Sequence, residues 1–377
     1  MMKLPELHFG DSIAQIPIIQ GGMGVGISLS GLAAAVANEG GVGVIAAAMI
    51  GMDEPDVGKN PTEANIRALR NEIRKAKEKM TQGLLGVNIM VALTNFADLV
   101  KTSIREGADI IFSGAGLPLD LPKYLSEEFP GELAEKARTK LVPIVSSGRA
   151  AAVLCKKWLA RYDYLPDGFV VEGPMAGGHL GFKPEELDDP NFALEKILPE
   201  VVAAVKPFEV ESGRRIPVIA AGGIYTGADI AKYLELGASG VQMGTRFVAT
   251  YECDADQAFK DAFVAARKQD ITVIKSPVGM PGRAILNDFL LAVREGRKKP
   301  FKCPFHCIKT CDVVHAPYCI SQALANAKKG ILKHGFAFCG ENVWRVDKIV
   351  SVKELINSLR QEFEDFWAQK TALAAEK

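Results

Sequence analysis

Residues 216–247 read IPVIAAGGIYTGADIAKYLELGASGVQMGTRF, and this stretch holds the pattern that predicts the fold. The β-branched run 216–219 predicts a strand, which leads through two alanines into Gly222 and Gly223. Because glycine has no Cβ, the backbone at this point can turn tightly and approach a ligand closely. We therefore expect a strand that feeds a binding loop.

A helix and a second strand complete this unit. Thr226 and Asp229 have the spacing of a capping arrangement at the start of a helix, and a short strand over 240–243 follows that helix. The second strand delivers Gly244 and Thr245. Backbone N–H groups at a helix N-terminus bind anions, so these two glycine-marked strand ends predict a phosphate cradle.

The whole chain alternates strand and helix patterns. Besides the two strands above, strand patterns lie at residues 16–19, 42–45, 85–90, 109–112, 141–145 and 168–172. Eight strands that alternate with helices predict an α/β fold, the TIM (β/α)8 barrel, whose ligand sites lie at the C-terminal ends of the strands. We expect the barrel to occupy residues 1–270 and a smaller C-terminal lobe to occupy residues 271–377.

Composition excludes several classes of protein. The 377 residues include 45 Lys and Arg and 45 Asp and Glu, so the net charge is zero, and no basic run typical of nucleic-acid binding is present. No apolar run approaches the roughly 18 residues that a membrane span needs, and the N-terminus lacks an apolar signal core. We therefore predict a cytoplasmic protein that acts on a small-molecule substrate, with neither nucleic acid nor membrane as partner. The sequence leaves a homodimer open.

His179 is the leading candidate for chemistry. It follows the strand 168–172 through a small-residue loop, and none of the other four histidines follows a barrel strand. Imidazole titrates near neutral pH, so His179 can exchange a proton with a substrate held over the barrel mouth. The plain alternative is a loop histidine that only hydrogen-bonds to backbone. Glu172 is either a second acid–base group or a hydrogen-bond acceptor for a cofactor, and we favour the acceptor.

Two further strand ends carry candidate ligand contacts. Residues 20–26 form a glycine-rich loop after the first strand, for which a plain tight turn is the alternative interpretation. Asn88 places an amide near the end of the strand 85–90, where the barrel mouth is expected.

Five ordered segments resemble the nitronate monooxygenase family, formerly called 2-nitropropane dioxygenases. They lie within roughly residues 10–290, at residues 18–23, 86–90, 172–179, 220–224 and 242–247. The same superfamily contains the FMN-dependent enoyl-ACP reductases. The motifs therefore specify flavin and barrel better than they specify substrate.

The resemblance implies FMN bound non-covalently over the barrel mouth. It places the phosphate on glycines and a threonine at the strand ends, and the ring and ribityl chain near four longer side chains. The predicted cofactor residues are Met23, Gly24, Asn88, Glu172, Gly177, Gly222, Gly223, Gln242, Met243, Gly244 and Thr245.

His179 aligns with the catalytic histidine of the family. In nitronate monooxygenases this histidine can deprotonate a neutral nitroalkane, and oxidation of the nitronate with O2 gives a carbonyl compound and nitrite. In the enoyl reductases, NAD(P)H reduces the flavin and hydride passes to an enoyl thioester. Nitronate oxidation is our main interpretation and enoyl thioester reduction is the alternative, because Glu172 stands where nitronate enzymes usually carry Gln.

A cysteine-rich segment over 303–319 also departs from the family pattern. Its four cysteines have the spacing C-x3-C-x3-C-x7-C, and in a reducing cytosol they are thiols or metal ligands rather than disulfides. Four thiolates this close can bind a soft metal, and the arrangement resembles iron–sulfur ligation more than a zinc ribbon. The alternative is a set of plain thiols. The predicted ligands are Cys303, Cys307, Cys311 and Cys319.

The remaining C-terminal patterns predict a strand over 271–274, a helix over 322–334 and an amphipathic helix over 352–366, whose apolar stripe is more typical of a core than of an interface. Arg283 ends a flexible-looking loop and either reaches an anionic group or has a structural role.

Overall fold

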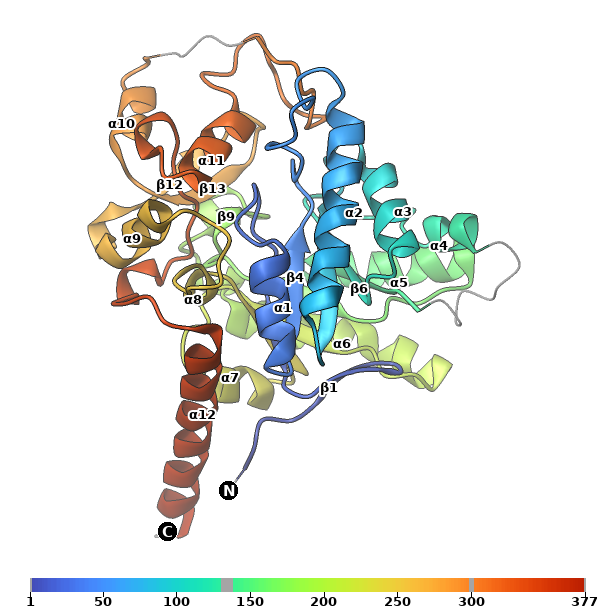
Figure 1. The fold of residues 1–377 in the computed structure, drawn as a ribbon. Helices are drawn as coiled ribbons and strands as arrows, with labels where there is room; N and C mark the ends of the chain where they lie inside the picture. The colour runs from blue at the N-terminus through green and yellow to red at the C-terminus, as the bar shows by residue number, and fades with distance from the viewer. Residues whose placement is uncertain (1, 130–137, 298–301, 376–377) are drawn as a thin grey trace.

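The computed structural model describes residues 2–129, 138–297 and 302–375 (Figure 1). Within these residues, eight parallel strands form a closed barrel, which confirms the predicted fold class. Each strand pairs with the next barrel strand along the chain, and the last pairs with the first. The strands are β3 (Ile18–Gln20), β4 (Val42–Ala46), β5 (Leu84–Met90), β6 (Ile110–Gly114), β7 (Lys140–Val145), β8 (Phe169–Glu172), β10 (Val218–Ala221) and β11 (Gly240–Met243).

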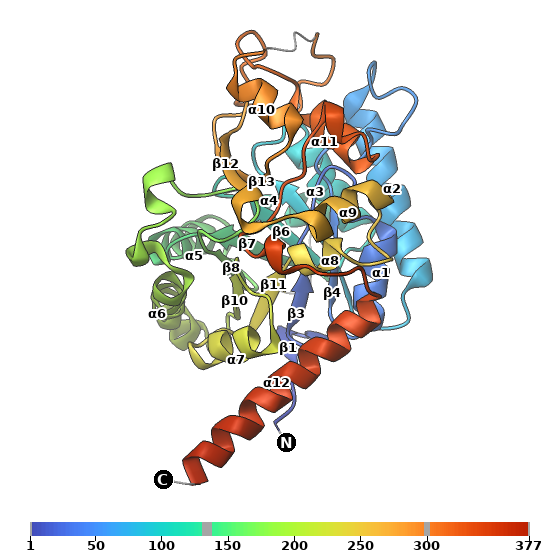
Figure 2. The ribbon, with the colours of Figure 1, turned by 90° about the vertical axis from the view of Figure 1, so that its left-hand side faces the viewer.

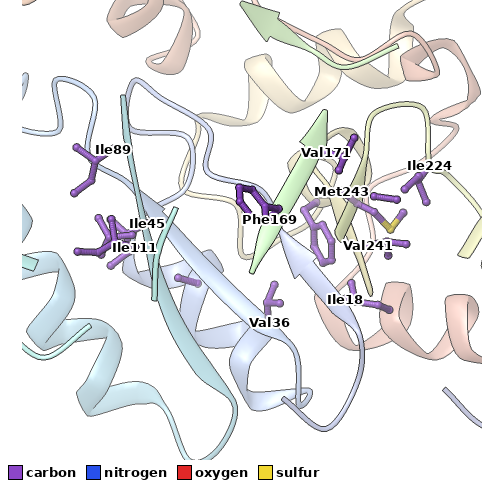
Figure 3. Packing of buried hydrophobic residues seen from close by; sticks show 14 of the residues in the cluster. Ile18, Val36, Ile45, Ile89, Ile111, Phe169, Val171, Ile224, Val241 and Met243 are labelled. Atoms are coloured by element: carbon purple, nitrogen blue, oxygen red, sulfur yellow. The ribbon is translucent and has the colours of Figure 1, made fainter. Parts of the chain in front are cut away.

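Helices surround the barrel and cover its outer face (Figures 1 and 2). Apolar residues from strands and helices fill the layer between them, as Figure 3 shows for Ile18, Val36 and Ile45. Among the described helices, none is long and apolar enough to cross a membrane. The surrounding helices are α1 (Ser30–Asn38), α2 (Pro61–Lys79), α3 (Phe96–Arg105), α4 (Lys123–Glu128), α5 (Gly148–Tyr162), α6 (Leu194–Ser212), α7 (Gly227–Glu235) and α8 (Thr245–Val248).

A hairpin of β1 (Leu7–Phe9) and β2 (Ser12–Ala14) packs against the inside of the barrel. Leu7 and Phe9 are fully buried in one cluster with strand residues that point inward. A Cβ on Gly168 or Gly240, which immediately precede or begin strands β8 and β11, would lie within about 3 Å of this hairpin. The hairpin therefore closes the N-terminal end of the barrel and leaves ligands the opposite end.

The predicted cap at the start of α7 is present. Asp229 donates its backbone N–H to Thr226 Oγ1 over 3.1 Å, and Thr226 donates its own N–H to Asp229 Oδ2 over 2.8 Å. Both donors lack partners inside the helix, so the reciprocal pair fixes where α7 begins. The glycine loop after β10 is thereby held between a strand and a capped helix.

The C-terminal lobe lies over one end of the barrel in Figures 1 and 2. Its sheet takes in a piece of the barrel loops, because β9, only two residues long, pairs with β13. The predicted strand over 271–274 is confirmed. The elements of this region are β9 (Gly178–His179), α9 (Gln257–Ala265), β12 (Ile271–Lys275), β13 (Pro281–Ile285), α10 (Asp288–Arg294) and α11 (Ile320–Lys328).

The prediction of one helix over 322–334 is wrong in its second half. The helix α11 ends at Lys328, and Gly330 takes a φ of +77°, a left-handed conformation that ends helices. A separate turn of 3-10 helix covers Leu332–His334. Apolar Ile331 and Leu332 follow the glycine, which is why the sequence suggested one element.

The last helix, α12 (Val352–Ala375), returns to the barrel and packs against α7 and α1. Its apolar stripe, including Leu355, Ile356, Leu359 and Phe363, is buried, so the core interpretation of this stripe is confirmed. The helix is longer than predicted, and its end extends away from the barrel (Figure 2). Because this C-terminal helix packs against barrel helices, the division of the chain at residue 270 stays a prediction.

Candidate active site

A cavity of about 650 Å³ lies at the C-terminal ends of the barrel strands, beneath the lobe. The structure brings to it all the residues that the sequence suggested for catalysis and cofactor binding. These are Met23, Gly24, Asn88, Glu172, Gly177, His179, Gly222, Gly223, Gln242, Met243, Gly244 and Thr245. Their individual roles stay predictions, but they are neighbours around one space.

The glycines at one side of the cavity are required by the backbone. Gly222 and Gly223 follow β10 with φ angles of +98° and +81°, which L side chains rarely adopt. A Cβ on Gly222 would lie 3.0 Å from the backbone of the loop after β8. The two strand-end loops can pack this closely, and leave backbone facing the cavity, only because these positions are glycine.

A segment of the lobe, Cys339–Asn342, clamps these glycine loops. Gly340 donates its N–H to Thr245 Oγ1 over 3.1 Å, and Asn342 donates Nδ2–H to the carbonyl of Gly223 over 2.6 Å. Glu341 donates its N–H to the carbonyl of Met175 over 3.1 Å. Sequence patterns did not assign a role to this segment, although the Gly-Glu-Asn triplet directly after an apolar run was a usable signal.

Arg283 has the structural role and does not line the cavity. Its guanidinium is buried and donates to the carbonyls of Pro174 and Ala176, each over 2.6 Å, and pairs with Glu341 over 2.8 Å. Arg283 therefore holds the loop between Glu172 and His179 against the lobe. A buried guanidinium needs this set of acceptors, because an unpaired one would be costly.

His179 lies in the cavity wall between barrel and lobe. Its Nε2 is 2.8 Å from Ser276 Oγ, and its ring meets Phe338 edge to face with centroids 5.1 Å apart. Burial without a carboxylate partner lowers the pKa of His179 to about 4. The imidazole is therefore neutral at pH 7 and available to accept a proton.

Three polar side chains in the cavity lack protein partners. Within the described residues, the side chains of Asn88, Glu172 and Gln242 make no hydrogen bond and no ion pair, although all three line the cavity. Burial alone raises the pKa of Glu172 to about 7. In contrast, the buried amide of Gln20 is satisfied by the backbone of Val44 and Gly21. All three side chains are partly exposed to the cavity, so their polar groups are free to hydrogen-bond to a polar ligand there.

The four cysteines of the segment 303–319 surround a second cavity, of about 210 Å³, in the lobe. Cys307 is buried with Sγ 3.1 Å from Ser321 Oγ, and burial with neighbouring thiols raises the pKa of Cys319 to about 11. No three of the described His, Cys, Asp and Glu side chains are grouped so as to hold a metal ion. The structure therefore places the four predicted ligands around one cavity, but their side chains do not converge on a single metal position. The metal site stays a prediction.

Comparison with known proteins places the chain in a family. Residues 9–362 match the family model described as nitronate monooxygenase. The chain belongs to the nitronate monooxygenase family. It is thereby a flavin-dependent oxidoreductase, as the sequence motifs predicted.

Curated relatives of this family member carry two kinds of name. A probable nitronate monooxygenase of Staphylococcus saprophyticus is 27% identical over 310 residues, 78% of this chain and 82% of its own. A (3aS,4S,5R,7aS)-5-hydroxy-7a-methyl-1-oxo-octahydro-1H-indene-4-carboxyl-CoA dehydrogenase of Rhodococcus jostii is 32% identical over 278 residues, 73% of this chain. The match spans just under two thirds of that dehydrogenase, 64%.

Solved structures similar to this chain also carry these two kinds of name. FabK from Thermotoga maritima is 28% identical with a TM-score of 0.70, and the match covers 95% of both chains. A nitroalkane oxidase from Streptomyces ansochromogenes is 22% identical with a TM-score of 0.69, covering 95% of this chain and 97% of its own. At 22% identity, the likeness to the nitroalkane oxidase supports only the fold.

Replacing Gly244 by Val tests whether the glycine-lined side of the cavity holds the flavin. Gly244 has a φ of −118°, which L residues adopt, and a Cβ there would meet only Met23 within 4 Å, at 3.5 Å. We expect the valine to fill flavin space and weaken flavin binding at least tenfold, or about 1.4 kcal/mol. Flavin absorbance after desalting measures retention, and thermal unfolding checks the fold. Gly58→Val, at an open loop position, is the matched control. Full retention by the Gly244 variant would contradict this placement.

Replacing Glu172 by Gln tests whether burial raises the pKa of this unpaired carboxyl. Its pKa rises from 4.5 to about 7 on folding, so the folded state binds more protons than the unfolded state between these values. The free energy of unfolding of the flavin-free protein therefore falls as pH rises from 4.5 to about 7. This loss is at most about 3 kcal/mol, and less where cavity water solvates the carboxylate.

Urea unfolding at pH 5 and pH 8 measures the effect in wild type and Glu172→Gln. The variant is expected to lose less stability than wild type over this interval. His179 gives the opposite pH dependence of stability, because folding lowers its pKa. This contribution is the same in both proteins and cancels in the comparison. Equal pH dependence of the two proteins would show that Glu172 has an ordinary pKa.

Proposed function

We propose that this family member binds FMN and oxidises alkyl nitronates, which it can also form from neutral nitroalkanes, with O2 to a carbonyl compound and nitrite. The observation that carries the proposal is His179, a neutral imidazole in the wall of the strand-end cavity. Its position suits proton removal from a substrate carbon that is flanked by an electron-withdrawing group.

The cavity residues fit FMN. Gly222, Gly223 and Gly244 form a side where backbone is exposed for a phosphate, and a Cβ on Gly178 would meet nothing within 4 Å. Asn88, Glu172 and Gln242 offer unpaired polar groups to a ring edge or ribityl chain. When bound, FMN supplies a two-electron acceptor that O2 can reoxidise, while the protein supplies position and electrostatics.

The surroundings of His179 suit a base that acts on a neutral acid. No described carboxylate contacts its ring, so the imidazolium is unfavourable until a negative charge forms nearby. A nitronate formed beside the ring provides that charge and stabilises the protonated histidine. Ser276 Oγ, 2.8 Å away, holds the ring in place through Nε2. A preformed nitronate needs no proton removal and so does not need His179 for this step.

Reduction of an enoyl thioester is the second candidate. Glu172 favours it, because the resemblance associates Glu at this position with the enoyl reductases and Gln with the nitronate enzymes. The likeness to FabK over 95% of both chains, at 28% identity, supports the same candidate. So does the relative named as a carboxyl-CoA dehydrogenase. In this reaction NAD(P)H replaces the nitronate as the reductant of the flavin.

An anaerobic titration separates the two candidates. Purified protein is mixed with ethyl nitronate, and separately with NADH and NADPH, while the flavin absorbance near its long-wavelength band is followed. Bleaching by the nitronate supports the main proposal. Bleaching by NADH or NADPH alone, with recovery on addition of an enoyl thioester, would replace it with the second candidate.

Replacing His179 by Asn tests the base. The variant keeps a polar side chain but cannot accept the proton, so kcat/KM on neutral nitroethane is expected to fall by roughly 10²–10⁴. Turnover of preformed ethyl nitronate should stay within a few-fold of wild type. His334→Asn, which replaces an exposed histidine, is the matched control. Equal losses on both substrates would point to binding or orientation instead.

The pH profile provides an independent check. Because burial lowers the pKa of His179 to about 4, wild-type kcat/KM on nitroethane should stay level from pH 8 to about pH 5 and fall only as pH approaches 4. A fall already centred near pH 6.5, the ordinary value for histidine, would contradict a buried neutral base.

A further inference from the structure

We propose that the cavity lined by Cys303, Cys307, Cys311 and Cys319, here called the thiol cavity, binds an iron–sulfur cluster of the [4Fe–4S] type. The four sulfur-bearing residues come from the loop before α11 and from the residue that caps its start. Their convergence around one space of about 210 Å³ is the observation that carries the proposal.

The shape of the site favours a cluster over a single ion. Zinc–thiolate bonds of about 2.3 Å require the four sulfurs to lie roughly 3.8 Å apart around one point. No described group of His, Cys, Asp and Glu has such an arrangement. The thiol cavity also far exceeds the roughly 10–15 Å³ that a single water needs. Four thiols that surround a space can hold the inorganic core of an iron–sulfur cluster, because each iron atom of the core binds one thiolate.

The other cysteines show what plain core thiols look like in this chain. Cys155, Cys253 and Cys339 are buried in the main hydrophobic core, each packed among apolar side chains. Cys303, Cys311 and Cys319 are only partly buried and line a cavity. Hydrophobic packing explains the first group. Cys307 also belongs to a small apolar cluster and Cys311 packs against another, but these two, unlike the first group, line the thiol cavity together with Cys303 and Cys319.

The barrel holds the thiol cavity in place. Thr94, after β5, donates its N–H to the carbonyl of Cys307 over 3.1 Å, and Lys309 donates its N–H to the carbonyl of Ala92 over 2.9 Å. Lys309 and His306 also line the thiol cavity, whereas no described carboxylate does. The lining thus suits a group that, with four thiolates, is negatively charged.

The thiol cavity shares a wall with the strand-end cavity. Ile308 and Ile320 line both, and Ser321, which lines the strand-end cavity, has its Oγ 3.1 Å from Cys307 Sγ. A cluster in the thiol cavity would therefore lie one side chain away from the space assigned to the flavin. This proximity suits electron exchange between the two groups, a role that rests on the proposed binding of FMN.

The electron balance requires a one-electron donor, and we assign that part to a ferredoxin-type carrier. Two reduced carriers each give up one electron through the cluster. Bound FMN would accept these two electrons together with one proton from solvent. Both carriers would be left oxidised, and this path would serve the second candidate, in which the flavin reduces an enoyl thioester and the carrier takes the place of NAD(P)H.

Anaerobic purification with iron and sulfide present in the growth medium tests the site. We expect near-equal iron and acid-labile sulfide, close to four of each per chain, and an electron paramagnetic resonance signal after reduction with dithionite. Zinc without sulfide, or no metal in anaerobic and reconstituted protein, would overturn the proposal. Flavin content, measured in the same samples, reports separately on the proposed function.

Variants tie the cluster to the thiol cavity. Cys311→Ser, at a partly exposed position, should lower iron and sulfide together by at least tenfold while flavin content and thermal unfolding of the barrel stay unchanged. Cys307→Ser should do the same if the buried position tolerates the change, and Cys155→Ala is the control that should keep both iron and sulfide. Retention of iron and sulfide by Cys311→Ser would exclude this ligand set.

A further measurement tests the electron path. Reduced [4Fe–4S] ferredoxin is mixed anaerobically with wild type and with Cys311→Ser, and flavin bleaching is followed. We expect the variant to be at least tenfold slower, whereas bleaching by dithionite should be equal in the two proteins. Equal bleaching rates with ferredoxin in the two proteins would overturn the electron path and leave the cluster with a structural role. Protein without flavin would instead refute the proposed function, and the iron and sulfide counts would still decide the site.

Discussion

The buried guanidinium of Arg283 is the interaction on which the architecture of the active site depends. It satisfies the carbonyls of Pro174 and Ala176 and pairs with Glu341, so it joins a barrel loop to the clamping segment of the lobe. Removing one partner of a buried charge is costly, which makes this arrangement close to all-or-none. Because His179 follows the tied loop directly and pairs in the sheet with β13, the position of the candidate base is set by the lobe as much as by the barrel.

Barrel geometry explains why polar groups remain unpaired at the other side of the cavity. Parallel strands deliver their last residues to one end, and a hairpin with Phe9 closes the opposite end. Asn88, Glu172 and Gln242 therefore face the same space from three strands, and no cation among the described residues lowers the pKa of the carboxyl. These partly exposed groups are free to bind a polar ligand, and a perturbed carboxyl pKa is typical of a functional site.

The sequence predicted the barrel well because its information there is local. Each strand is a short apolar run, and small residues mark its end, so boundaries came within about two residues and every residue assigned to the flavin site lies in one cavity. What the sequence did not predict depends on partners distant in the chain. The clamp by Gly340 and Asn342, the role of Arg283, and the packing of the N-terminal hairpin exist only when the lobe and barrel meet. The end of α11 was different, since Gly330 was a local signal that the apolar residues on both sides of it obscured.

The shared wall between the two cavities bears on which reaction the enzyme performs. A nitronate oxidase receives electrons from its substrate and passes them to O2, so it needs no second redox group. A reductase must receive electrons from elsewhere, and a cluster across Ile308 and Ile320 would give a one-electron donor access without opening the substrate side. The raised pKa of Glu172 also favours a reductase, because a carboxyl with a pKa of about 7 can be neutral when a flavin gains negative charge. Occupancy of the thiol cavity therefore discriminates between the two functions as well as identifying a metal site: an occupied cavity shifts the balance toward thioester reduction, and a metal-free one toward nitronate oxidation.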